Sequence, residues 1–106
     1  QVDLLAVPAF LTGNRHWQKP WGGYTTFAGT SGDVDIAPTS ISEGEAWQRH
    51  SLPARLSSTP ARAGLTVFMR GQLWNLGSDG RSMLALPDRH LLAPDQPGTQ
   101  LVNLWL

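Results

Sequence analysis

The stretch Leu65-Thr66-Val67-Phe68-Met69 gives the strongest strand signal in this 106-residue sequence. Its β-branched and aromatic side chains are the types that fit a pleated, half-buried surface. Two further apolar stretches follow it, at 72–76 and 83–86, and the turn residues Gly77-Ser78-Asp79-Gly80 separate them. Since consecutive strands joined by short turns pair antiparallel, these three segments predict an antiparallel sheet.

On the N-terminal side of this stretch lies the best helix signal. Ser40 and Glu43 are three residues apart, which matches a capping box in which each side chain bonds the other residue's backbone N–H. We therefore predict a short helix over Ile41–Ser51, with Ala46 and Trp47 on its inner face.

The remaining segments are assigned by their turn residues and apolar runs. Tyr24–Ala28 and Val34–Ile36 flank a Gly-rich turn and predict a hairpin. Val2–Phe10 is apolar and contains Pro8, so we interpret it as the last turn of a helix that begins upstream. Residues 92–99 are rich in Pro, Asp and Gly and predict a loop, and residues 101–106 predict a closing strand.

Together these elements predict one globular domain over residues 1–106 with an α+β fold. It consists of an antiparallel β-sheet with an N-terminal helix end and one short helix packed on it. The sequence opens on Gln1 instead of a start Met, and we expect an upstream N-terminal helix to be missing.

Composition excludes several classes of protein. Eight basic and eight acidic residues give a net charge of zero, so the chain lacks the basic surface that nucleic-acid binding needs. It has no Cys, which excludes disulfides and thiolate metal sites. No apolar run approaches the roughly 20 residues that span a membrane.

No catalytic pattern is present. The three histidines, His16, His50 and His90, are far apart and form no H-E-x-x-H motif, and there is no G-x-S-x-G sequence. Glu43 and Glu45 are two residues apart, so they point to different sides of a helix. We predict a non-enzymatic protein with no metal and no cofactor.

The five Trp residues are the main candidates for core and contact residues. We expect Trp21, Trp47 and Trp74 in the core and Trp17 exposed beside a loop. Trp105 lies in an apolar segment that either docks as a strand or meets a partner chain. The predicted contact surfaces are the loop at 92–99 and the following residues: Arg15, His16, Trp17 and Trp105.

The sequence from Val7 to Gly13, followed after a spacer by Lys19-Pro20-Trp21-Gly22-Gly23 and a hairpin, resembles type IVb pilins. The resemblance covers about residues 7–70 and implies that a long helix ends before a turn into the sheet. Pro20, Trp21, Gly22 and Gly23 would set that helix-to-sheet turn. The family's C-terminal disulfide is absent, which fits a minor pilin or pseudopilin better than a major subunit.

This resemblance implies an extracytoplasmic structural subunit that acts in bacterial surface filament assembly or adhesion. Its location would be extracellular, at the cell surface or periplasmic. Its partners would be other pilin-like subunits or surface proteins, and it would meet the membrane only through a segment absent here. The alternative is a small β-rich module of a larger protein that binds carbohydrate or peptide through Trp17 and Trp105.

Overall fold

A computed structural model describes residues 2–11, 13, 15–22, 40–99, 101–103 and 105. A four-stranded sheet in the order β1-β2-β5-β6 forms its centre, and β3 and β4 make a separate two-stranded hairpin. The strands are β1 (Leu4–Ala9), β2 (Ala63–Phe68), β3 (Gly71–Leu73), β4 (Leu76–Ser78), β5 (Met83–Leu86) and β6 (Arg89–Leu92). The pair β1–β2 is parallel and the other pairs are antiparallel, so the predicted α+β class with a mostly antiparallel sheet is confirmed.

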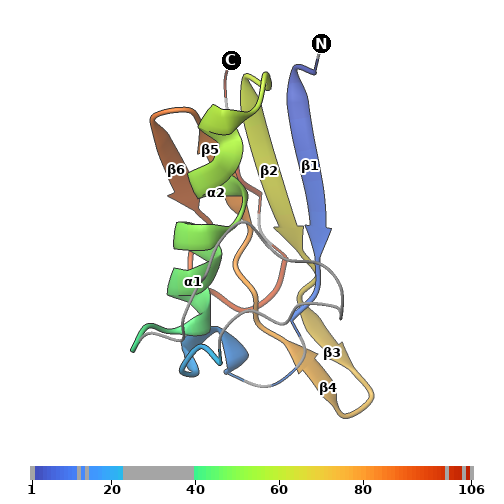
Figure 1. The fold of residues 1–106 in the computed structure, drawn as a ribbon. Helices are drawn as coiled ribbons and strands as arrows, with labels where there is room; N and C mark the ends of the chain where they lie inside the picture. The colour runs from blue at the N-terminus through green and yellow to red at the C-terminus, as the bar shows by residue number, and fades with distance from the viewer. Residues whose placement is uncertain are drawn as a thin grey trace, which may run out of the picture.

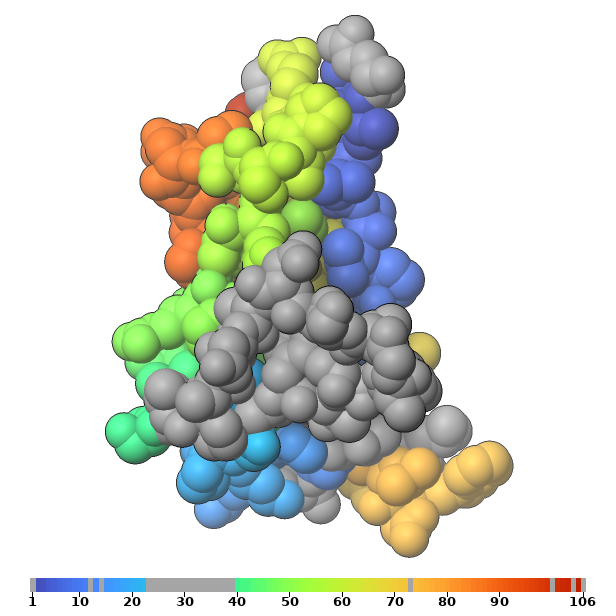
Figure 2. Space-filling view, viewed as in Figure 1, coloured from blue at the N-terminus to red at the C-terminus, as the bar shows by residue number. Residues whose placement is uncertain are grey.

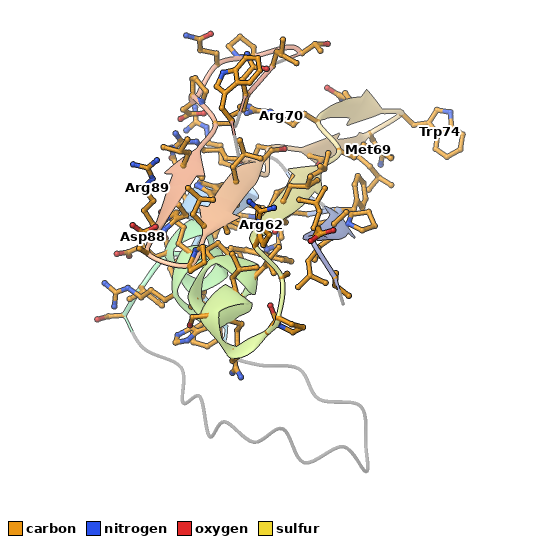
Figure 3. All side chains as sticks on the ribbon, turned by 90° about the horizontal axis from the view of Figure 1, so that it is seen from above. Arg62, Met69, Arg70, Trp74, Asp88 and Arg89 are labelled. Carbon is orange, nitrogen blue, oxygen red and sulfur yellow. The ribbon has the colours of Figure 1, made fainter. Side chains whose placement is uncertain are left out.

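The helices lie on one face of the sheet (Figure 1). α1 (Glu43–His50), α2 (Leu52–Arg55) and the 3₁₀ turn η2 (Leu56–Ser58) follow one another, and a first 3₁₀ turn, η1, spans His16–Gln18. We call the side of the sheet that carries α1 and α2 the helix-covered face, and the opposite side the outer face. Viewed from above, the C-terminal segment runs along the outer face (Figure 3).

The N-terminal apolar segment is a strand, so the predicted helix end is wrong. β1 pairs with β2 along its whole length, from Leu4 opposite Ala63 to Ala9 opposite Phe68. Pro8 has no N–H to donate, and this is tolerated because β1 is an edge strand. The sequence hides the strand because every residue of β1 is apolar, so no alternation with polar residues is visible.

The helix is confirmed, but its predicted cap is wrong by two residues. Ser42, not Ser40, is the N-cap: its hydroxyl accepts from the Glu45 N–H, and the Glu45 carboxylate accepts from the Ser42 N–H. Both pairs have the same Ser-x-x-Glu spacing. With α1 starting after Ser42, Gly44 packs directly against the Trp17 indole, and a Cβ at this position would collide with the ring.

In the second half of the chain, two of the three predicted strands are confirmed. β2 covers Leu65–Phe68 of the predicted strand, and β5 has the predicted bounds. The single strand predicted at 72–76 is wrong, because Trp74 has a φ of 55° and the chain reverses there between β3 and β4. β6 was not predicted, and it includes Leu92 of the predicted loop at 92–99. The rest of that loop, residues 93–99, is confirmed, because it has no helix or strand.

Two apolar clusters fill the space between the sheet and the helices. One contains Leu11, Trp17, Phe68 and Met83, and the other contains Leu56, Ala61 and Ala85. Trp17 is only 8% exposed, so the prediction of an exposed Trp17 is wrong. Trp21 is 9% exposed, and Trp47 packs against the first cluster, as predicted for both.

The predicted hairpin at 24–28 and 34–36, together with Gly23, lies outside the described residues. Residues 101–103 and 105 have no strand assignment, so the predicted closing strand is not formed in the part that the structure describes.

Candidate interaction surface

The segment Lys19–Gly22 fixes the chain to the start of α1. The Trp21 N–H donates to the Ile41 carbonyl at 2.9 Å, and the Lys19 carbonyl accepts from the Glu43 N–H at 2.8 Å. The Trp21 ring stacks on His50 with the ring centres 5.2 Å apart. Pro20 bridges to Ser42, and Gly22 is exposed. Pro20 and Trp21 therefore have a structural role, but not at a helix-to-sheet turn, because β1 and η1 precede them.

The predicted contact residues Arg15, His16 and Trp17 fall in different environments. Arg15 is exposed and has a φ of 57°, and His16 is half-buried. The Trp17 ring meets the Phe68 ring edge to face at 5.4 Å, and its backbone N–H donates to Asp79. Trp17 therefore belongs to the core and is unavailable to a partner. Trp105 is 92% exposed, and its role as a contact residue stays a prediction.

An exposed apolar group that the sequence did not predict surrounds the β3–β4 hairpin. Met69 is 64% exposed, Trp74 is 84% exposed and Leu76 is 44% exposed. We call these three residues the hairpin patch. The hairpin projects from the body of the molecule, and Trp74 stands at its tip (Figures 2 and 3).

Trp74 occupies a backbone position that normally takes another residue. Its φ of 55° lies in the left-handed region, where turns usually place Gly, Asn or Asp. The signal available in the sequence was the pair Trp74-Asn75 between two apolar stretches, but Trp is rare at the first position of such a turn. An exposed indole held in a costly conformation is typical of a residue selected for contact instead of for stability.

Hydrogen bonds hold the hairpin patch in place. Ser78 Oγ donates to the Met69 carbonyl at 2.6 Å, and Gln72 Nε2 donates to the Trp74 carbonyl at 3.1 Å. The Gly13 N–H also donates to the Gly77 carbonyl at 2.8 Å, which ties the hairpin to the segment that follows β1. The patch is therefore presented on an anchored support.

The outer face of the sheet is mostly apolar and incompletely covered. Strand alternation and register place Ala6, Leu65, Leu84 and Leu91 in one row across it, because each faces the next in the pairing. Leu91 is 44% exposed, and Val67, two residues after Leu65, is 50% exposed.

A cavity of about 470 Å³ lies between this face and the C-terminal segment. Its walls include Leu65, Val67 and Leu84 from the sheet and Leu101 and Val102 from the segment. Small-molecule pockets typically measure about 300–1,000 Å³, so this volume is large enough for a ligand.

Arg70 places a cation in the wall of this cavity. Its Nη1 is buried and has no hydrogen-bond partner among the described residues, and no Asp or Glu lines the cavity. Arg70 lies on the outer side of the sheet, beside the C-terminal segment (Figure 3). A buried donor without a partner costs about 1–3 kcal/mol, and more when the group is charged.

Thr66 Oγ1 is likewise buried without a partner in the described part of the chain. By alternation the Thr66 side chain lies on the helix-covered face with Phe68. Of the two residues with such an atom, Arg70 is therefore the one whose side chain lines the cavity.

Within the described ranges, no group of three or more His, Asp or Glu is placed to hold a metal ion. No helix in that part of the chain has the length and apolar character that crossing a membrane requires. Comparisons with known proteins found no matching family model, no similar curated protein and no similar solved structure.

Proposed function

We propose that this chain is a non-enzymatic structural subunit that acts by assembling with other proteins. Following the resemblance of residues 7–70, the assembly would be a bacterial surface filament, with the chain in the place of a type IV minor pilin or pseudopilin domain. The resemblance assigned a helix end to the segment that forms β1, so the hairpin patch, not the resemblance, is the main support.

Trp74 is the observation that carries this function. Trp and Met are enriched in protein interfaces, and Trp is prominent among the residues whose loss costs the most binding energy. The hairpin patch combines both types, and its three apolar side chains do no acid–base chemistry. A net charge of zero lets copies pack without strong mutual repulsion.

The test is the effect of Trp74→Ala on assembly in the native organism and on self-association of the purified protein. We expect at least a tenfold loss of filament incorporation or association, because truncating an interface anchor costs about 2 kcal/mol or more. Trp74→Phe keeps an aromatic ring and should restore much of the loss.

The matched control is Leu91→Ala, which truncates an exposed apolar side chain on β6, away from the hairpin. It should leave assembly unchanged. Equal behaviour of Trp74→Ala and the unaltered protein in both assays would remove the support for an assembly role.

The second candidate is a small carbohydrate- or peptide-binding module, and the 92% exposure of Trp105 favours it. Trp17, the other residue assigned to that function, is buried and no longer supports it. Saturable fluorescence quenching in a glycan or peptide screen, lost in Trp105→Ala, would favour this module over the assembly subunit.

A further inference from the structure

We infer that the outer-face cavity binds an alkyl carboxylic acid, with the carboxylate paired to Arg70 and the alkyl chain along the sheet. This binding site is independent of the proposed assembly role, because it lies on the sheet and not on the hairpin patch.

The charge balance of the cavity calls for an anion. Arg70 contributes a guanidinium whose Nη1 is buried without a partner among the described residues, and the lining holds no carboxylate. Arg70 is half-buried, and holding its Nη1 out of water is unfavourable unless an anion and its hydrogen bonds compensate it. A carboxylate accepts from guanidinium in a charge-assisted, bidentate geometry and is ionised at pH 7.

The rest of the lining calls for an alkyl chain. Leu65, Val67, Leu84 and Leu101 present aliphatic side chains. Besides Arg70, the described polar side chains in the wall are those of Ser82 and Thr99, because the Thr66 side chain belongs to the helix-covered face. Ser82 Oγ already accepts from the Phe68 N–H. A peptide would bring several backbone N–H and C=O groups that need partners there, whereas an alkyl chain brings none.

The site is also accessible to such a ligand. Leu101 is 86% exposed and Val67 is 50% exposed, and both line the cavity, so they stand where it opens to solvent. Binding would bury these side chains and neutralise Arg70 in one step.

The test is calorimetric titration of the purified full chain with decanoate, below the concentration at which decanoate forms micelles. We expect one decanoate per chain, at least tenfold weaker binding of decan-1-ol, and no binding of acetate, which has the charge without the chain. A free-carboxylate tripeptide of Leu and Val forms a separate arm and should bind more weakly than decanoate.

Arg70→Met removes the charge and keeps a long apolar side chain. It should lower decanoate affinity to the level of decan-1-ol while leaving decan-1-ol binding unchanged, which also shows that the cavity is intact. Arg89→Met is the matched control, because Arg89 is exposed on β6 and does not line the cavity. It should leave both affinities unchanged.

Several results would overturn this inference. These are no decanoate binding, equal affinity for decanoate and decan-1-ol, an unchanged preference in Arg70→Met, or tighter binding of the tripeptide. The comparison of decanoate with decan-1-ol on the unaltered protein needs no variant, so it decides the role of charge even if Arg70→Met does not fold. Val67→Trp, which fills the opening of the cavity, should then abolish binding of both ligands.

Discussion

The two faces of strand β2 differ sharply in how they are packed. Phe68 points to the helix-covered face, is 4% exposed and lies edge to face against both Trp17 and Trp47. Its neighbour Val67 points to the outer face, is 50% exposed and lines a cavity. One strand therefore supplies the core on one side and an open apolar surface on the other, so stability and binding are assigned to separate faces.

The largest expected effect on stability comes from truncating the Phe68 ring at the centre of the helix-covered face. Phe68→Ala should lower the free energy of unfolding by about 3–5 kcal/mol, because it removes the ring that Trp17 and Trp47 both contact and leaves a cavity. Chemical denaturation followed by Trp fluorescence would measure it. Val67→Ala is the control on the same strand and should cost under about 1 kcal/mol. A similar loss of unfolding free energy in the two variants would mean that the two faces of β2 are equally well packed.

A second test adds a Cβ to the helix-covered face instead of removing a side chain from it. A Cβ at Gly80 would collide with the Phe68 ring. The ring is held between Trp47, at 4.9 Å, and Trp17, at 5.4 Å, so it cannot easily move aside. Gly80→Ala should therefore cost about 1–3 kcal/mol, measured by thermal unfolding.

The control for this substitution is Gly22→Ala, because a Cβ at Gly22 meets no atom of the described residues within 4 Å. It should leave the melting temperature nearly unchanged. If Gly80→Ala is as mild as Gly22→Ala, the helix-covered face is looser than the ring contacts indicate.

The elements that form the helix-covered face were easier to predict from the sequence than the exposed surfaces. β2 and β5 are short apolar stretches bounded by turn residues, and α1 carries a capping box. Local signals therefore predicted these three elements, although they did not distinguish Ser42 from Ser40 as the cap of α1. β1 was missed because its edge position, which makes Pro8 acceptable, depends on pairing with β2, more than 50 residues away. That pairing is a tertiary effect that no local pattern encodes.

The candidate surfaces were less predictable, for a related reason. Side-chain type predicts Trp in the core, and this was right for Trp21 but wrong for Trp74, whose exposure follows from the positive φ of one residue. Trp17 was placed outside because it neighbours loop residues, yet it packs against Phe68 from the far half of the sequence. Arg70 gave no signal in the sequence, since the lack of a partner for its Nη1 among the described residues depends on which side chains surround it.

A third prediction tests whether the Ser42 cap sets the start of α1 and so positions it on the helix-covered face. Ser42→Ala should lower stability by about 1 kcal/mol, because it removes the hydroxyl that accepts from the Glu45 N–H. Ser40→Ala is the matched control, because it breaks the equivalent pattern two residues earlier, where the structure forms no cap. It should have almost no effect. The reverse order in urea denaturation would mean that α1 starts earlier, and the contact between Gly44 and Trp17 would then be lost.

The smallest expected effect concerns a residue that belongs to neither face. Trp74→Gly relieves the left-handed backbone at the hairpin tip, while it also adds conformational freedom to the unfolded chain. Because the indole is 84% exposed, little packing is lost, and we expect the free energy of unfolding to change by less than about 1 kcal/mol. The same variant should lose self-association as fully as Trp74→Ala. A large loss of stability in the dilute, unassociated protein would instead mean that the ring supports the hairpin itself, and Trp74 would then be a structural residue rather than a contact anchor.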